Sequence, residues 1–390
     1  MLRPAELVIS ADAGPATSSY REGQEVIMDT TTLDTVVIGA GVAGLHTARL
    51  LAARGVDFEI IEAADRVGDT WRERYRSLRL FTPRRWAELP GMRLEIGYFE
   101  YPTGNGFADY LERCAATIGA RVRLSTRVDR LSLEPDGRFR LALSTGEEII
   151  ATHVVVAAGA HHVPTVPPFA GELDPAIHQL HSLDYRGPED LEPGSVLVVG
   201  AANSGTDIAL EATASGHEST ISGRHPGQIP PDIDTPIGNL MSGLFLRRLR
   251  ATTIDTARGQ EFLAANRGHG VNLVRNKTRD LVKAGIAQVA RVAGVRDGMP
   301  QLESGETLDV ANVVWCTGSL PDFAWIDIPG VLSPEGVAHR RGMVDAVPGL
   351  AFVGLPFQYS VMSPTLVGMR PDAEYVVEHL LAPAPVPQAA

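Results

Sequence analysis

The chain has 390 residues, a formal net charge of −12 at pH 7 and 21% charged residues. This length allows two domains, and the ordinary globular composition excludes wholesale disorder. The acidic balance, which no block of lysine and arginine relieves, excludes nucleic acid as a favoured partner. Two cysteines far apart in sequence, and no apolar run long enough to cross a bilayer, predict a cytoplasmic protein with no membrane span.

Predicted elements begin after a loose extension over residues 1–32. An apolar strand leads into the turn Gly39-x-Gly41-x-x-Gly44 and a helix, and a second strand ends at Glu62. In such a turn the first glycine permits the tight bend, the second lets backbone approach a diphosphate, and the third allows close helix packing. The helix N-terminus offers N–H groups to phosphate, and the Glu62 carboxylate can accept hydrogen bonds from a ribose. The unit predicts a dinucleotide site, which we assign to FAD.

A second unit of the same kind follows at residues 196–222. It keeps Gly200 and Gly205 and has Ser204 at the start of its helix, but Ala202 occupies the middle position. The alanine methyl group would crowd a diphosphate and shift or weaken its binding. The unit is therefore either a second dinucleotide site or a degenerate copy kept for packing.

The strand after the second turn ends in Ser222-Gly223-Arg224, where the first unit has the acidic Glu62. A carboxylate would repel a 2′-phosphate, whereas Ser222 and Arg224 would hold one. This strand end predicts NADPH in preference to NADH. The alternative is that Arg224 is an ordinary solvated side chain.

Two more apolar strands, at residues 154–159 and 313–318, flank the second unit. Their placement predicts an α/β fold with two Rossmann-like dinucleotide-binding domains, the NADPH domain being inserted into the FAD domain. The expected boundaries are residues 33–163 and 313–381 for the two parts of the FAD domain, 164–312 for the NADPH domain, and 382–390 for a disordered tail.

Over about residues 33–380 the sequence resembles the flavin-containing monooxygenase family, in its broad sense with YUCCA-type and Baeyer–Villiger-type relatives. Besides the glycine turns, the motifs that carry the resemblance are Glu62 with Arg66, Gly68-Asp69-Thr70-Trp71, Leu78 to Pro83, Phe169-Ala-Gly171 with His181 to Tyr185, Asn203-Ser204-Gly205, and Trp315 to Asp322. The resemblance implies FAD and NADPH as cofactors, with Arg66, Thr70 and Trp71 along the FAD.

Three positions depart from the family's pattern. Asp69 stands where a second glycine is usual, and Ile177 occupies the usual glycine position four residues before His181. Phe81 stands where oxygenating members often have an asparagine that contacts the reactive edge of the flavin. An apolar ring cannot replace the hydrogen bonds of that asparagine.

The function that the resemblance implies is that of an NADPH-dependent flavin monooxygenase. It would insert one atom of molecular oxygen into a small organic substrate, at nitrogen, sulfur or a carbonyl carbon, through a C4a-peroxyflavin. We expect Phe81, Gln358 and Tyr359 to line the flavin and substrate pocket, and no metal site; no catalytic acid–base pair can be assigned. Two alternatives stay open: an NADPH-dependent reductase or oxidase, because of Phe81, and a non-catalytic flavin-binding sensor, because of Ala202.

Overall fold

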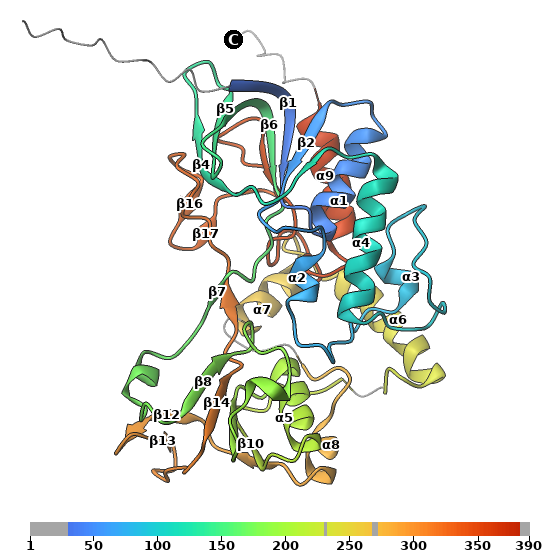
Figure 1. Cartoon of the computed structure of the whole chain (residues 1–390). Coiled ribbons are helices and arrows are strands. Elements are labelled where there is room, and N and C mark those ends of the chain that lie inside the picture. The colour runs from blue at the N-terminus through green and yellow to red at the C-terminus, as the bar shows by residue number, and fades with distance from the viewer. Residues whose placement is uncertain (1–29, 230–231, 267–271, 383–390) are drawn as a thin grey trace, which may run out of the picture.

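The computed structural model describes residues 30–229, 232–266 and 272–382, which form two sheet-based units stacked one above the other (Figure 1). The upper sheet has the order β3-β2-β1-β6-β5-β4, with β18 beside β6. The central strand β1 pairs in parallel with β2 and β6, and β5 and β4 continue the sheet in antiparallel. The strands are β1 (Thr30–Ile38), β2 (Phe58–Ile61), β3 (Val122–Arg123), β4 (Val128–Leu133), β5 (Phe139–Leu143), β6 (Glu148–Val156) and β18 (Leu350–Phe352).

Both faces of the upper sheet are covered. Val37 of β1 packs in the core that faces the helices, whereas Val36 and Ile38 lie in the opposite core. Successive side chains of a strand alternate between faces, and burial of both faces explains the continuous apolar run in the sequence. The helices of this unit are α1 (Val42–Ala52), α2 (Asp69–Arg72), α3 (Arg84–Ala87), α4 (Gly104–Ile118) and α9 (Met369–Leu380).

The lower sheet is wholly parallel, with the order β11-β10-β9-β14-β8. Its strands are β8 (His178–His181), β9 (Val196–Val199), β10 (Ser219–Ser222), β11 (Ala287–Val289) and β14 (Asn312–Trp315). The rest of this unit comprises α5 (Asn203–Ala214), α8 (Thr278–Lys283), the hairpin β12 (Val292–Arg296) and β13 (Met299–Leu302), and the 3₁₀ turns η1 (Pro168–Glu172) and η2 (Pro188–Asp190).

The chain passes between the units twice, and the two crossings pair with each other. β7 (Val163–Pro164) leaves the upper unit after β6, β15 (Ser319–Leu320) returns after β14, and the two form an antiparallel ribbon. Because the crossings follow directly from the carboxyl ends of β6 and β14, both sheets point these ends toward the junction between the units (Figure 1). After the return, a small hairpin forms from β16 (Leu332–Ser333) and β17 (Gly336–Val337).

Two predicted boundaries differ from the structure. Residues 30–32 fall in the predicted loose extension, yet they lengthen β1 and pair with β6; their exposed threonine side chains give no apolar signal. β14 is predicted to begin the second part of the FAD domain, but it lies between β9 and β8 in the lower sheet. An apolar strand buried on both faces carries no mark of which parallel sheet it joins. Residues 1–29 and 383–390 of the predicted extension and tail lie outside the described residues.

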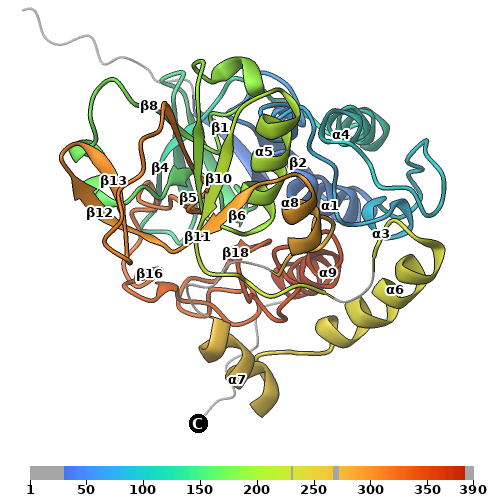
Figure 2. The same ribbon diagram turned by 90° about the horizontal axis from the view of Figure 1, so that it is seen from below.

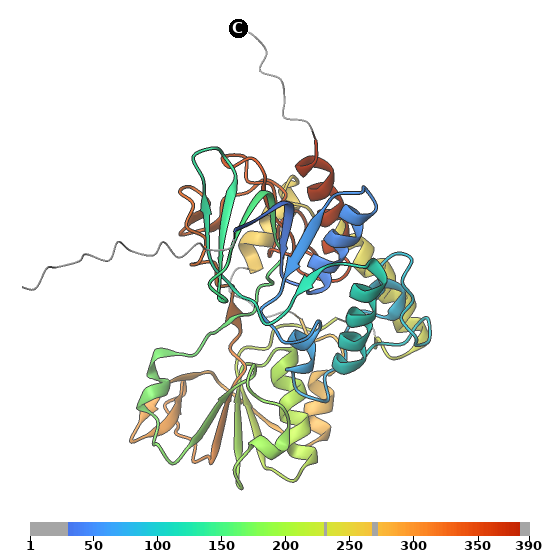
Figure 3. The ribbon, with the colours of Figure 1, turned by 45° about the horizontal axis from the view of Figure 1, so that its top comes forward.

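Residues 232–266 form a further departure from the predicted NADPH domain. They contain α6 (Pro236–Arg250) and α7 (Ala257–Asn266), which lie against the upper unit (Figures 2 and 3). The Asn239 side-chain amide donates to the Phe99 carbonyl oxygen at 3.1 Å, and the Ile254 N–H donates to the Tyr359 carbonyl oxygen at 2.9 Å. A segment that lies between β10 and α8 of the lower unit in sequence is thus packed on the upper unit. In the described ranges, no helix is both long and apolar enough to cross a membrane.

Candidate active site

The first glycine turn lies between β1 and α1. Gly39 has a φ of 104°, and a β-carbon built on it would lie 2.6 Å from the Ala157 carbonyl oxygen, just beyond β6. A β-carbon on Gly44 would lie 1.8 Å from the Gly39 carbonyl oxygen, which is closer than any side chain can come. Gly41 has a φ of −69°, and a β-carbon there would meet none of the described atoms within 4 Å. The turn is therefore packed tightly at its two ends and open at its middle.

The N-terminus of α1 faces this open space. Its first turn has neither a side-chain cap nor an acidic residue among the described residues, so its first N–H groups and positive dipole end are available to a phosphate. The Glu62 carboxylate accepts hydrogen bonds from the N–H groups of Ala40, at 2.5 Å, and Ala64, at 2.9 Å. These bonds hold the carboxylate at the rim of the turn, where a ribose would lie. The residues present fit the adenosine and diphosphate portion of FAD.

The second glycine turn repeats this geometry between β9 and α5. Gly200 has a φ of 118°, with its virtual β-carbon 2.2 Å from the Cys316 carbonyl oxygen, and that of Gly205 lies 1.8 Å from the Gly200 carbonyl oxygen. Ala202 has φ and ψ of −85° and −170°, close to the −69° and −178° of Gly41. Its methyl group therefore points to the side that is open at Gly41. Ser204 is exposed in the first turn of α5.

The end of β10 separates the two residues predicted to hold a 2′-phosphate. Ser222 is fully buried; its hydroxyl donates to the Ala290 carbonyl oxygen at 2.7 Å and accepts from the Val292 N–H at 3.0 Å. Contrary to the prediction, this hydroxyl supports the strand end from inside and is not presented to a ligand. Arg224 is exposed and has no ion-pair partner within the described ranges. Of the two residues, only Arg224 presents its side chain to solvent.

The motif from Gly68 to Trp71 forms the short helix α2. Gly68 has a φ of 92°, and a β-carbon there would lie 2.7 Å from the Ala108 carbonyl oxygen of α4. Asp69, which replaces the usual second glycine, accepts a hydrogen bond from the Arg66 N–H at 3.0 Å and pairs with Arg72 at 3.0 Å. The aspartate thereby stabilises the start of α2, so the departure from the family's pattern is tolerated.

The three residues near α2 that are predicted to lie along FAD have different surroundings in the structure. The Arg66 guanidinium pairs with Glu112 of α4 at 2.9 Å, and this pairing lowers the pKa of the Glu112 carboxyl. The Trp71 ring packs edge-to-face on Phe107, with ring centroids 5.2 Å apart, whereas Thr70 is exposed. Trp71 therefore anchors α2 to α4.

Phe81 lies where the two units meet. Arg275, from the lower unit's segment before α8, donates to the carbonyl oxygens of Arg79 at 3.0 Å and Leu80 at 2.9 Å. Its guanidinium carbon lies 5.6 Å from the centroid of the Phe81 ring and 5.1 Å from that of Tyr101. The arginine thus fixes the segment that carries Phe81 to the unit that carries the second glycine turn.

Gln358 and Tyr359 serve the structure of their own loop. Gln358 is fully buried; its amide oxygen accepts from the N–H groups of Gly354 and Leu355, and its amide nitrogen donates to the Arg341 carbonyl oxygen at 3.3 Å. The Tyr359 ring stacks on the Arg341 guanidinium at 3.6 Å. The polar atoms of Gln358 are thus engaged within the protein, and the side chain is not presented to a ligand.

A second contact between the units was not predicted from the sequence. The Tyr75 hydroxyl of the upper unit donates to Asp207 of α5 at 2.8 Å, and the Asn276 amide donates to the same carboxylate at 2.5 Å. Burial raises the pKa of Asp207, and the two hydrogen bonds oppose that rise. Asp207 follows Asn203 by one helical turn, yet no motif spacing marks it as a partner of Tyr75.

Lys277 is a further buried polar residue that no motif marks. Its ammonium group donates to the carbonyl oxygens of Ile229 at 2.9 Å, Leu273 at 3.2 Å and Val274 at 2.6 Å. Burial lowers the pKa of this ammonium. The three bonds join two loops of the lower unit and hold the segment before Arg275 in place.

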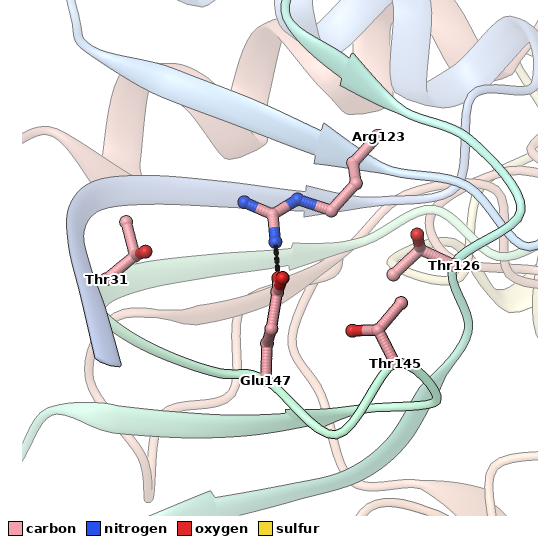
Figure 4. A pocket seen from close by; sticks show the side chains of 5 residues that line it. All are labelled: Thr31, Arg123, Thr126, Thr145 and Glu147. Atoms are coloured by element: carbon pink, nitrogen blue, oxygen red, sulfur yellow. Dashed lines mark hydrogen bonds and ion pairs between the residues drawn. The ribbon is translucent and has the colours of Figure 1, made fainter. Parts of the chain in front are cut away.

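A separate hollow of about 480 Å³ lies at the edge of the upper sheet, lined by Thr31, Arg123, Thr126, Thr145 and Glu147 (Figure 4). Arg123 forms an ion pair with Glu147 there. It contains none of the predicted site residues. In the described part of the chain, no group of three or more histidine, cysteine or acidic side chains could hold a metal ion.

The chain is similar to known proteins in sequence and in fold. The family described as pyridine nucleotide-disulphide oxidoreductase matches residues 36–258, more than half of the chain. An oxidoreductase from Geobacillus kaustophilus, named "Uncharacterized oxidoreductase CzcO-like", is 36% identical over 90% of this chain and 98% of the relative. Indole-3-pyruvate monooxygenase YUCCA1 of rice is 35% identical over 50% of this chain and 49% of the relative. The solved flavin-containing monooxygenase from Stenotrophomonas maltophilia has a TM-score of 0.73 and 24% identity, covering 90% and 98% of the two chains.

The fold and the two glycine turns define a flavin-dependent oxidoreductase with two dinucleotide-binding domains. The chain belongs to the pyridine nucleotide-disulphide oxidoreductase family and, within it, to the flavin-containing monooxygenases, whose cofactors are FAD and NADPH. The predicted family, fold class and cofactors are therefore confirmed.

Proposed function

We propose that this chain is an NADPH-dependent monooxygenase that inserts one oxygen atom into a small organic substrate, at nitrogen, sulfur or a carbonyl carbon. The observation that carries the proposal is that both glycine turns lie at the carboxyl ends of their sheets and face one junction, across which the ribbon of β7 and β15 runs. Such an arrangement would let a nicotinamide cofactor held by the lower turn reach a flavin held by the upper one. FAD, when bound, supplies hydride acceptance and oxygen activation.

The residues of the chain supply binding, orientation and exclusion of water. Gly39, Gly41 and Glu62 would hold the FAD, and Gly200 and Arg224 the NADPH. Arg275 keeps the segment around Phe81 at the junction, where the ring excludes water from the reacting groups. The rice relative named as an indole-3-pyruvate monooxygenase supports oxygen insertion as the reaction type.

The test is NADPH-driven oxygen uptake by the purified holoenzyme with a panel of amines, sulfides and ketones. We expect at least one class to give an oxygenated product in near-stoichiometric ratio to the NADPH consumed, with ¹⁸O from labelled oxygen gas in the product. Recovery of all consumed oxygen as hydrogen peroxide with every substrate class would replace this proposal by an oxidase. NADPH oxidation that consumes no oxygen would replace it by a reductase.

Phe81 sharpens this test, because an apolar ring there excludes water but donates no hydrogen bond. Phe81→Asn should lower the fraction of NADPH electrons that leaks to hydrogen peroxide without substrate, about tenfold if one hydrogen bond is gained. Phe81→Leu is the matched control, since it stays apolar and should leave the leak unchanged. An equal leak in all three proteins would show that Phe81 does not border the reacting groups.

A further inference from the structure

Helix α6 carries an exposed stripe of large apolar side chains. Ile237, Leu240, Met241, Leu244 and Phe245 are 77%, 66%, 48%, 59% and 41% exposed, and we call these five residues the α6 stripe. They recur at helical spacing, so they lie along one side of the helix. Single exposed apolar residues are ordinary on protein surfaces, but a contiguous patch of them marks an interaction site.

The opposite side of α6 faces the protein, and it is small and polar. Gly238, Asn239 and Ser242 are buried. Asn239 donates to the Phe99 carbonyl oxygen at 3.1 Å and to the Tyr101 hydroxyl at 2.9 Å, and Arg85 donates to the Asn239 carbonyl oxygen at 2.8 Å. Hydrogen bonds to the upper unit thus fix the rotation of α6, with its apolar side turned outward.

Two aromatic rings continue the apolar surface beside α6. Tyr98 and Phe99 are 55% and 58% exposed and contact each other edge-to-face, with centroids 5.1 Å apart. The Arg85 guanidinium, which is bonded to α6, lies 5.0 Å from the Phe99 ring centroid. Phe99 and Leu240 also line a cavity of about 610 Å³ at the start of α6. The patch therefore borders a cavity.

The charge at the end of the stripe is positive although the whole chain is acidic. Arg247, Arg248 and Arg250 are exposed in the last turn of α6, and none forms an ion pair within the described ranges. At the other end of the helix, Asp232 pairs with Arg279 at 2.9 Å and Asp234 with Arg275 at 3.3 Å. The three arginines are thus exposed to anions in solution, although Arg250 also interacts electrostatically with the buried Asp372 carboxyl, whereas Asp232 and Asp234 are already neutralised.

We propose that the α6 stripe docks this enzyme on an anionic lipid surface. The five apolar side chains would enter the boundary between headgroups and acyl chains, and the three arginines would contact lipid phosphates. A second copy of the chain fits less well: antiparallel pairing of two α6 helices would place each arginine group opposite Asp232 and Asp234, which are already paired. The mode is peripheral binding through one helix face, and it does not depend on the proposed oxygenation.

The experiment is co-sedimentation of the full-length holoenzyme with sucrose-loaded vesicles of phosphatidylcholine alone or with about a third phosphatidylglycerol. Wild type should pellet with the anionic vesicles and much less with the neutral ones, and added salt should weaken the binding. Leu244→Glu should weaken it at least about tenfold, and the triple change of Arg247, Arg248 and Arg250 to glutamine about a hundredfold. Flavin absorbance and far-UV circular dichroism establish that each variant is folded.

Leu133→Glu is the matched control, because Leu133 is an exposed leucine of β4, on the side of the molecule opposite α6 (Figure 1). Its binding should equal that of wild type. No pelleting of folded wild type with anionic vesicles would overturn the proposal, as would equal losses in Leu133→Glu and Leu244→Glu. A concentration-dependent dimer that Leu244→Glu abolishes, without vesicle binding by wild type, would reassign the stripe to contact between copies.

Discussion

The two glycine turns share one backbone geometry, and of the three glycine positions of the motif they differ only at the middle one. Gly39 and Gly200 both have positive φ, and a β-carbon on either would clash with the carbonyl oxygen of the residue that follows a neighbouring strand. At the middle position the upper turn has Gly41 and the lower has Ala202, with nearly equal dihedral angles. The outer glycines are thus required by the protein's own backbone, whereas the middle position faces open space, where a cofactor diphosphate would lie. A change there reports on the cofactor and leaves the fold intact.

The largest effect is expected when a methyl group is added at an outer glycine position of either turn. Gly44→Ala would place a β-carbon 1.8 Å from the Gly39 carbonyl oxygen, and we expect a loss of at least about 3 kcal/mol in the free energy of unfolding, together with loss of FAD. Gly205→Ala, with the same 1.8 Å approach to Gly200, should disrupt the lower turn and spare FAD binding. Denaturant unfolding and flavin absorbance measure both effects. FAD loss in Gly205→Ala but not Gly44→Ala would reverse the assignment of the two units.

A bulkier side chain at the middle position should change cofactor affinity much more than it changes the stability of the protein. A β-carbon on Gly41 would meet no described atom within 4 Å, so we expect Gly41→Val to change the stability of the FAD-free protein by less than about 1 kcal/mol. FAD affinity should fall at least about a hundredfold, because the side chain enters the diphosphate space. Titration of the apoprotein with FAD gives the affinity. Full FAD occupancy of this variant at wild-type affinity would remove the diphosphate from this turn.

The strand ends provide the next contrast, between Glu62 and Arg224. Arg224→Ala should weaken NADPH about ten- to a hundredfold, since one charge-assisted contact to a 2′-phosphate contributes about 1.5–3 kcal/mol. NADH should be nearly unaffected, because it lacks that phosphate. The rate of flavin reduction at varied NADPH and NADH measures both dissociation constants. Equal weakening of the two cofactors would assign Arg224 to the fold or to a shared group.

The smallest effect is expected from Ala202→Gly, the substitution that makes the lower turn resemble the upper. Ala202→Gly should tighten NADPH and NADH alike by a few-fold, of the order of 1 kcal/mol, because the methyl group no longer crowds the diphosphate. The added backbone freedom of glycine in the unfolded chain should lower stability by about 0.5–1 kcal/mol. Weaker binding of both cofactors would mean that the Ala202 methyl group contacts them favourably.

Sequence reasoning located those residues whose role is local. The glycine spacings and Glu62 could be identified because a turn and the strand next to it fix their positions. The buried orientation of Ser222 could not, since alternation along a four-residue strand leaves open which face is inward. Arg275 was missed for a different reason: its contacts lie nearly 200 residues away, at Arg79 and Leu80, and no spacing encodes such a pairing.

The same limit applied to whole elements. β14 was assigned to the wrong sheet because two parallel sheets buried on both faces demand the same apolar run. The position of α6 against the upper unit depends on Asn239 and Arg85, two polar residues more than a hundred positions apart. The outward apolar face of α6 was visible in the sequence only as helical periodicity, which normally indicates the inward side.

The ribbon of β7 and β15 also restricts how the two units can move. A single connecting strand would let one unit swivel about the chain axis, whereas two hydrogen-bonded strands resist torsion and bend only across their plane. Any opening of the junction is then a one-dimensional motion, and it must break the Tyr75–Asp207 bond and the Arg275 bonds together. The two units are thus joined by one two-stranded hinge, and the contacts of Tyr75 and Arg275 hold them together away from it.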